Sequence, residues 1–561
     1  MPGSFSGRCS ARIVAGRAEL PGSFSGRCSA RIVAGRPATV VRMSRRITSA
    51  TILVAVTTLL AGCVPVFGAD PRFATNSGAK PQGVAVPKPP PGGPPPIAAP
   101  KNDLSWRDCT SKLNADAGVP GAPGVKLECA SFDADLDPVN GGSGSVSIGV
   151  VRARSGKTPK DAGPLVFTTG SDIASSTQLP VWLSRAGADV LNSHPIVAID
   201  RRGMGMSSPI DCRDRQQRDE MRDQSQFQPG DDPVANLSEA SNTATTNCTD
   251  AISPGDSAYD NTHAASDIER LRNIWDVPAV ALVGIGNGAQ VALTYAGSRP
   301  DKVARLILDS PVALGASAEA AAEQQVKGQQ ASLDAFAAQC AAIACALGPD
   351  PKGAVSALLT TARSGQGLGR VSLASITGAI TTALGFPVGD GASNTTNLAN
   401  ALVAARSGDM NPLNNLINRT AVTQDSDGQF INSCSDAVNR PTPDRVRELV
   451  VAWAKLYPQF GTVAALDLIK CVHWPTGSAP QAPKELKVDV LLLGVQNDPI
   501  VGNEGVAATA ATVINSRAAS KRVMWQGIGH GASIYSACSV PPLVGYLDSG
   551  KLPGTDTYCP A

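Results

Sequence analysis

The sequence is poor in histidine, in aromatic residues and in net charge. Its 561 residues include only four histidines, aromatic residues make up 4% of the chain, and the formal net charge is +2. No two histidines have the i, i+4 spacing that places two ligands on one helix face, so we expect no metal site and no cofactor. A nearly neutral chain without an arginine-rich or RNP-like stretch also predicts no nucleic-acid partner.

Long apolar runs are missing as well, and the longest one near the start is too short to remain in a bilayer as a spanning helix. Residues 2–17 are repeated letter for letter as residues 21–36, so we treat residues 1–42 as a duplicated leader outside the fold. Residues 43–62 then combine a basic start, an apolar run and small residues, which is typical of a signal peptide. Leu-Ala-Gly-Cys at residues 60–63 resembles a bacterial lipobox, which implies cleavage before Cys63 and its lipidation. A plain secretory signal with an incidental cysteine is the alternative.

Residues 63–101 form a predicted tether rather than a packed domain. Its stretch of prolines and glycines at residues 87–96 favours extended polyproline II structure and would hold a domain away from a membrane. We therefore expect an exported protein that meets the membrane through its lipid anchor only, or that is secreted.

The cysteines agree with export, because an even number remains once Cys9, Cys28 and Cys63 are set aside. No C-x-x-C motif occurs, which argues against a zinc knuckle or a thioredoxin-like site. Sequence cannot fix the connectivity. The simplest hypothesis pairs neighbours along the chain: 109 with 129, 212 with 248, 340 with 345, 434 with 471, and 538 with 559.

The remaining chain alternates short apolar strands with helical patterns, which predicts an α/β fold with a mostly parallel, doubly wound sheet. We expect strands near residues 146–154, 165–167, 195–199, 279–283, 303–308, 488–493 and 521–526. Between the strands near 303–308 and 488–493 lies an alanine- and glutamine-rich block, which predicts an inserted helical cap over residues 313–483. Residues 102–312 and 484–561 then form the two parts of the core.

Three local features are also predicted. Residues 212–259 look like a polar, disulfide-pinned excursion, and residues near 390–397 like a Gly/Asn-rich loop. Thr262 is expected to cap the helix that follows it.

One expected side chain is missing from the stretch that organises the fold. The apolar strand at residues 279–283 runs into Gly-Ile-Gly-Asn-Gly and then into a helix, in the frame of the nucleophile elbow G-x-S-x-G. The flanking glycines Gly284 and Gly288 are present, but Gly286 stands where a nucleophilic serine is expected. A glycine has no side-chain atom that could attack a carbonyl.

Several stretches in a shared order carry a family resemblance: residues 200–207 (DRRGMGMS), the elbow with residues 305–309, residues 434–436 (CSD), residues 471–475 (CVHWP), Asp498-Pro499 and residues 529–531 (GHG). In these features the chain resembles the tripeptidyl-aminopeptidase-like branch of the α/β-hydrolases, exported actinobacterial serine hydrolases related to proline iminopeptidases. The resemblance covers about residues 106–559 and implies the α/β-hydrolase fold. It also implies that Asp498 is the triad acid and His530 the general base, in the chain order that this fold uses.

The same resemblance implies an oxyanion hole made by the backbone of Asn287 and by the loop that contains Gly170 and Ser171. That loop reads Thr-Thr-Gly-Ser-Asp in place of the family's glycine-proline-rich sequence. Asp436 is a weaker candidate that could meet a substrate's α-ammonium group, or could equally be a structural partner of the adjoining disulfide.

Three hypotheses follow. The chain is a peptidase or esterase that uses another nucleophile, such as Ser171, Ser207 or a water held by His530. Alternatively, it is a catalytically impaired hydrolase-family protein that binds a peptide, an ester or a cell-wall ligand, or it is a structural scaffold. Loss of a catalytic serine costs on the order of a millionfold in turnover, which favours the second hypothesis.

Overall fold

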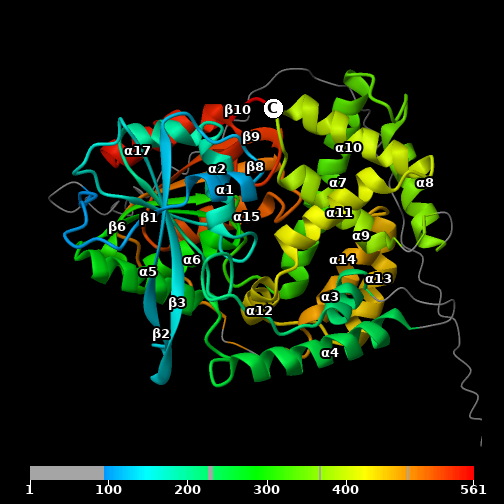
Figure 1. The fold of residues 1–561 in the computed structure, drawn as a ribbon, viewed down its shortest axis with the longest axis horizontal. Helices are drawn as coiled ribbons and strands as arrows, with labels where there is room; N and C mark the ends of the chain where they lie inside the picture. Colours follow the sequence, from blue (N-terminus) through cyan, green and yellow to red (C-terminus); the bar gives the residue numbers. More distant parts are fainter. Residues whose placement is uncertain (1–93, 225–231, 366–367, 370, 476, 478) are drawn as a thin grey trace, which may run out of the picture. The chain divides into compact units, whose positions relative to one another are not determined.

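The computed structural model describes residues 94–224, 232–365, 368–369, 371–475, 477 and 479–561 (Figure 1). Within these residues, ten strands form one sheet in the order β1-β2-β3-β5-β4-β6-β7-β8-β9-β10. The strands are β1 Arg107–Asp108, β2 Val125–Asp137, β3 Gly142–Ser155, β4 Leu165–Thr168, β5 Ile196–Ile199, β6 Val280–Ile285, β7 Val303–Asp309, β8 Val490–Asn497, β9 Ser520–Ile528 and β10 Thr557–Cys559.

In the order of the sheet, every pair of neighbours from β5–β4 to β9–β10 is parallel. The pairs β1–β2, β2–β3 and β3–β5 are antiparallel. The predicted α/β fold with a mostly parallel, doubly wound sheet is therefore confirmed. Because parallel strands end at the same edge, the loops after β4, β6, β8 and β9 gather there. This edge positions the candidate site.

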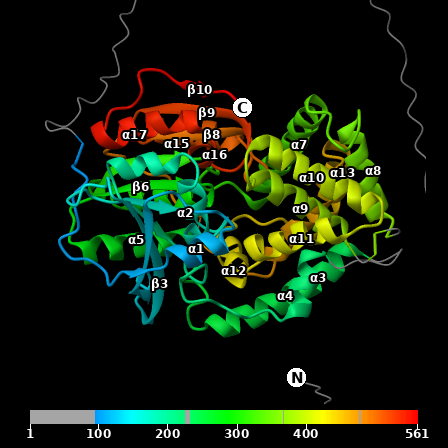
Figure 2. The ribbon, with the colours of Figure 1, turned by 45° about the horizontal axis from the view of Figure 1, so that its top comes forward.

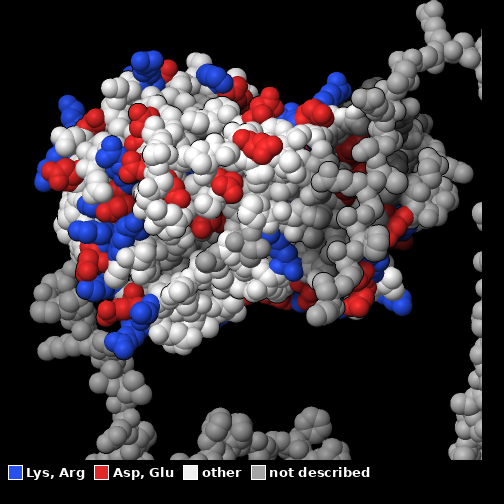
Figure 3. Space-filling view, turned by 90° about the horizontal axis from the view of Figure 1, so that it is seen from below, with Lys and Arg blue, Asp and Glu red and all other residues white. Residues whose placement is uncertain are grey.

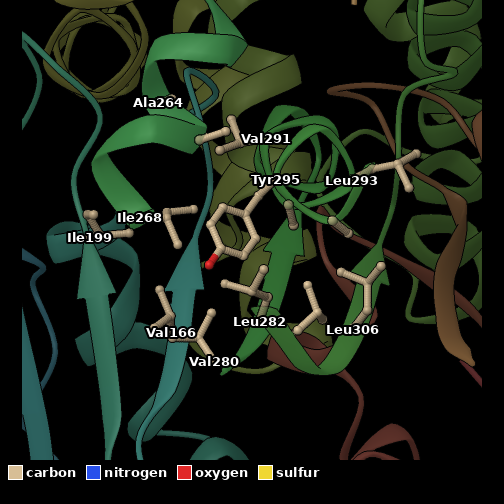
Figure 4. Packing of buried hydrophobic residues seen from close by; sticks show 14 of the residues in the cluster. Val166, Ile199, Ala264, Ile268, Val280, Leu282, Val291, Leu293, Tyr295 and Leu306 are labelled. Atoms are coloured by element: carbon tan, nitrogen blue, oxygen red, sulfur yellow. The ribbon is translucent and has the colours of Figure 1, made fainter. Parts of the chain in front are cut away.

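Helices cover both faces of the sheet. Successive side chains of a strand point to opposite faces, so a buried strand packs against helices on both sides. Val166, Leu282 and Leu306 pack with α5 and α6 on one face, while Phe167 and Val283 pack with α2 and α17 on the other. Figure 4 shows the first face, where the Tyr295 ring of α6 lies among aliphatic side chains of the strands. The helices outside the block between β7 and β8 are α1 Thr110–Asp116, α2 Ser175–Leu183, η1 Gly187–Asn192, α3 Arg215–Arg222, α4 Pro233–Ile252, α5 Asn261–Trp275, α6 Asn287–Ser298, η2 Pro300–Lys302, α15 Glu504–Asn515, α16 Ala532–Tyr535, η4 Ala537–Ser539 and α17 Val540–Ser549.

A helical cap is inserted between β7 and β8, as the composition of that block predicts (Figures 1 and 2). It has its own hydrophobic core, which includes Leu333, Ile376, Leu402 and Trp453. Its elements are α7 Ala318–Ala342, α8 Pro351–Arg363, α9 Leu373–Gly385, α10 Gly391–Arg406, α11 Asn411–Gln424, α12 Asp427–Asp436, α13 Pro443–Leu456, α14 Gly461–Asp467 and η3 Leu468–Cys471.

Three local predictions need correction. The expected excursion at residues 212–259 is pinned by the Cys212–Cys248 disulfide as predicted, but it contains α3 and α4, and α4 buries Val234 and Leu237 in the core of the cap. The expected loop near 390–397 is the start of α10, because the Asp390 side chain accepts from the Ser393 N–H and caps the helix. The helix α5 is capped by Asp260, two residues before Thr262, for the same reason.

The neighbour pairing of cysteines is confirmed. The ten cysteines of the described residues form five disulfides: Cys109–Cys129, Cys212–Cys248, Cys340–Cys345, Cys434–Cys471 and Cys538–Cys559. Two of them tie the ends of α4 and α12 to neighbouring segments, so the disulfides reinforce the cap as well as the sheet.

The predicted leader, the signal peptide, Cys63 and the tether up to residue 93 lie outside the described residues. Among the helices that the structure describes, none combines the length and apolarity that crossing a bilayer requires. On the face seen in Figure 3, acidic and basic side chains are interspersed, with uncharged surface between them. This face offers no broad basic patch of the kind that binds nucleic acid.

Candidate active site

The elbow between β6 and α6 has the geometry that its sequence predicts. Gly286 has φ +57° and ψ −120°, a left-handed backbone conformation that glycine adopts without steric cost. The flanking glycines are required by close packing, since a Cβ at Gly288 would overlap the carbonyl oxygen of Thr168. The backbone therefore keeps a nucleophile turn while position 286 carries no side chain.

The predicted acid and base lie side by side at the carboxyl edge of the sheet. Asp498 follows β8, His530 follows β9, and His530 Nδ1 donates to Asp498 Oδ2 over 2.9 Å. Both side chains are buried. Asp498 Oδ1 also accepts from the N–H groups of Ile500 and Val501, which fixes the carboxylate. The pair has the arrangement of a triad acid and base, and their catalytic roles remain predictions.

The position in front of Gly286 is filled by a carboxylate from the oxyanion loop. A Cβ built on Gly286 would overlap Asp172 Oδ2 and would lie 2.7 Å from His530 Nε2. The same Oδ2 atom accepts from the Asn287 N–H over 2.7 Å and lies 3.4 Å from His530 Nε2, an ion-pair distance. Asp172 thus occupies the space between base and oxyanion donor that a serine side chain would use.

Two carboxylates on opposite sides of one imidazole change its protonation. Burial disfavours the imidazolium, but the negative charge of Asp498 and the contact with Asp172 outweigh it and raise the pKa of His530 to about 10. His530 is therefore protonated at neutral pH. An imidazolium has no free lone pair, so it cannot accept a proton from a nucleophile in this state.

The predicted oxyanion hole is half present. The Asn287 N–H points into the site and holds Asp172, at the amino end of α6 where the helix dipole favours an anion. Gly170 and Ser171 do not supply the second donor: the Gly170 N–H donates to Thr168 Oγ1 and the Ser171 N–H to Asn287 Oδ1. The prediction for these two residues is wrong, because the loop folds its own amides into local hydrogen bonds.

The hydroxyl groups proposed as substitute nucleophiles do not meet the base. Ser207 is buried, donates to the Asp200 carbonyl and accepts from the Gly149 N–H. Ser171 contributes its backbone to the Asn287 side chain, as described above. Among the described residues, no hydroxyl hydrogen-bonds to His530 Nε2.

Asp436 supports the elbow from the cap and does not face a ligand. At the end of α12 it accepts from both terminal nitrogens of Arg201, at 2.5 and 3.0 Å, and from Asn287 Nδ2 at 3.1 Å. Arg201 also donates to Asn287 Oδ1 at 2.7 Å. A carboxylate with these partners has no free oxygen for a substrate ammonium group, so the weaker prediction for Asp436 is replaced by a positioning role.

Sequence reasoning missed Asp172 as a site residue. The signal was present, because the elbow and the oxyanion loop both depart from the family pattern, one by losing a side chain and the other by gaining an acidic one. Only the structure shows that the added carboxylate of Asp172 lies where the side chain of position 286 is missing. The described residues contain no group of three or more His, Cys, Asp or Glu side chains that could hold a metal ion.

Comparison with known proteins agrees with the geometry. Residues 178–351 match the family model described as alpha/beta hydrolase fold, and residues 457–559 match the one described as TAP-like protein. The chain is 26% identical over 324 residues to the serine protease Hip1 of Mycobacterium tuberculosis H37Rv and to that of Mycobacterium bovis. The match covers 56% of this chain and 57% of the relative, so the chain spans just over half the length of these curated relatives.

Among solved structures, the chain is similar to the esterase RhEst1 from a Rhodococcus species. The identity is 14% over 74% of this chain and 99% of the esterase, with a TM-score of 0.34. The sheet order, the elbow and the two family matches lead to one conclusion: the chain is an α/β-hydrolase-fold protein with a TAP-like C-terminal region.

Proposed function

We propose that this protein is an exported, lipid-anchored member of the serine-peptidase type of α/β-hydrolase that binds a peptide, an ester or a cell-wall ligand at the cell envelope without serine-based turnover. One observation carries the proposal: Asp172 Oδ2 occupies the place of the missing nucleophile, between the Asn287 N–H and His530. The similarity to a serine protease over part of the chain supports a peptide as the ligand class.

The chemistry of the filled site supports impaired catalysis in three ways. No side chain at Gly286 attacks, and loss of a catalytic serine costs on the order of 10⁶-fold in turnover. The raised pKa of His530 removes the general base at neutral pH. One oxyanion donor is missing, which costs a further ~10²–10³-fold. An active peptidase or esterase would have to overcome all three.

Export is supported by the lipobox-like sequence before Cys63 and by the disulfides, which persist in oxidising compartments. Metabolic labelling with an alkyne fatty acid tests the anchor. The full-length chain should incorporate the label, and Cys63→Ala should abolish incorporation and shift the protein to the medium. Equal labelling of both would overturn lipidation at Cys63.

A fluorophosphonate probe on the purified mature protein tests the impaired site. The native protein should remain unlabelled, because no activated hydroxyl is present. Gly286→Ser alone should also remain unlabelled, since its Cβ meets Asp172. The double variant Gly286→Ser/Asp172→Gly should label, because both the hydroxyl and its space are restored.

The controls separate the three hypotheses. Labelling of the native chain would overturn the proposal in favour of an active enzyme. Silence of the double variant would show that the remaining machinery is not assembled for catalysis and would favour a scaffold. Adding His530→Ala to the double variant should remove its labelling, which shows that the signal depends on the base.

A further inference from the structure

The cap contains a polar cavity that the elbow does not use. Its volume is about 170 Å³, and it lies among α7, α9, α11 and α14, which are neighbours in the cap (Figure 1). Its polar wall includes Gln325 and Gln329 of α7, Thr381 of α9, and Thr420 and Gln424 of α11.

The charged groups of the wall are paired with one another or with near neighbours. Lys470 lies 2.8 Å from Asp467, and Asp425 lies 3.2 Å from Arg213. Arg222, the remaining charged lining residue, lies 2.6 Å from Asp219. A charged ligand would therefore find no counter-ion of its own, and burying an uncompensated charge is costly. The cavity is suited to a neutral ligand.

The neutral groups of the wall offer donors and acceptors in equal measure. A glutamine amide has two N–H donors and a carbonyl acceptor, and a threonine hydroxyl both donates and accepts. Gln424 already donates one N–H to the Asp172 carbonyl, so its other N–H and its amide oxygen remain for a ligand. The Thr420 hydroxyl donates to the Leu416 carbonyl, so its lone pairs remain as acceptors. The Nε atom of Arg222 is a buried donor without a hydrogen-bond partner among the described residues. Phe460 adds one apolar wall.

The size restricts the ligand further. Sites for drug-sized molecules occupy ~300–1,000 Å³, whereas a cavity of about 150 Å³ holds a benzene ring. The cavity is therefore closer in size to a site for a single ring than to a site for a drug-sized molecule. A neutral ring that carries several hydroxyl groups, each both donor and acceptor, matches this wall.

We propose that the cap cavity is a binding site for a single neutral sugar ring. The ring hydroxyls pair with the amide and hydroxyl side chains of α7, α9 and α11, and the ring C–H groups pack against Phe460. The cavity does not include Gly286, Asp172, Asp498 or His530, and it touches the elbow through one lining residue, Gln424, whose side-chain N–H donates to the backbone carbonyl of Asp172 over 2.8 Å. That contact uses the backbone and not the Asp172 carboxylate, so the proposal does not depend on the proposed function of the elbow.

Saturation-transfer NMR and calorimetry on the purified mature protein test this site, with glucose and N-acetylglucosamine as neutral probes and glucuronate as the charged one. The neutral sugars should bind with millimolar affinity and glucuronate at least about tenfold more weakly. Thr381→Val, which keeps the shape and removes the hydroxyl, should weaken neutral-sugar binding about three- to tenfold.

Two controls make the test decisive. Thr361→Val is a matched change on α8 outside the cavity, where the hydroxyl donates to the Ala357 carbonyl, and it should leave sugar binding unchanged. Asp172→Asn should also leave sugar binding unchanged, whatever the fluorophosphonate labelling of the elbow shows. The proposal is overturned if no neutral sugar binds, if glucuronate binds equally well, if Thr381→Val binds like the parent, or if Asp172→Asn abolishes binding.

Discussion

The two halves of the candidate active site differ in how they are built. The acid–base half, Asp498 and His530, lies on loops directly after β8 and β9, and the two side chains pair at 2.9 Å. The other half has lost its nucleophile at Gly286, and Asp172 fills the space from a loop after β4. The first half has the arrangement of a hydrolase, whereas the second has been rebuilt around a carboxylate.

This difference lies in what the imidazole of His530 faces. In a working triad the imidazole faces a neutral hydroxyl and shuttles a proton. Here His530 faces carboxylates on both sides, so the same geometry becomes a buried ion cluster. The stability of that cluster, rather than turnover, is what the following experiments measure.

The largest effect is expected when the buried acid is removed. Asp498→Ala removes the fully buried partner of His530 and leaves only the longer, 3.4 Å contact with Asp172, so it should lower the free energy of unfolding by about 3–5 kcal/mol. Asp172→Asn keeps the shape, and its side chain is 15% exposed, so it should cost about 1 kcal/mol. Urea unfolding with intact disulfides measures both. Equal costs would contradict the asymmetry between the two halves.

A comparable effect is expected from pH. The pKa of His530 is about 10 in the folded chain and ordinarily near 6.5, so its stabilisation is fully present below about pH 6.5. It is lost as pH rises through about 10, on the order of 5 kcal/mol. Unfolding curves between pH 6 and 10.5 should show this decline. The decline should shrink in His530→Gln, and a pH-independent native protein would refute the charged imidazole.

Restoring the serine alone should destabilise the chain. Gly286→Ser forces a side chain into a left-handed conformation, which costs about 1–2 kcal/mol, and also meets Asp172. We expect a total cost of about 2–3 kcal/mol in thermal or urea unfolding. In the Asp172→Gly background the cost should fall to the backbone strain alone. Additive costs in this double-mutant cycle would show that the two positions do not compete for space.

The smallest effect concerns Ser207, one of the two serines that the sequence offers as substitute nucleophiles. Ser207→Ala removes a hydroxyl that bridges the Asp200 carbonyl and the Gly149 N–H, and should cost about 1 kcal/mol. It should not change labelling of the Gly286→Ser/Asp172→Gly variant by the fluorophosphonate probe. Loss of that labelling would give Ser207 a chemical role that its hydrogen bonds do not support.

Much of the fold could be predicted because short apolar strands separate cleanly from helical segments. The strand before Gly286 is buried on both faces, and its composition alone indicates a central parallel strand. The start of α10 could not be predicted from its Gly- and Asn-rich letters, because the capping bond from Asp390 and packing against the cap decide the outcome. The place of α4 in the cap depends on tertiary contacts of Val234 and Leu237.

The site shows the same limit. Asp498 and His530 could be predicted because chain order and strand ends fix them. The hydrogen bonds of the Gly170 and Ser171 amides could not be predicted, because several acceptors lie within reach of a loop and the sequence does not show which of them is used. Asp172 belongs to the same loop, and its place in the site becomes evident only from its position in front of Gly286.

The ion pair between Arg201 and Asp436 has a consequence for the mobility of α12. Arg201 follows β5 and Asp436 ends α12. The buried ion pair between them, with its two hydrogen bonds, therefore joins the cap to the elbow. Separating α12 from the elbow would break both of these charge-assisted hydrogen bonds, at a cost of several kcal/mol. We therefore expect α12 to stay fixed over the elbow while the protein is folded.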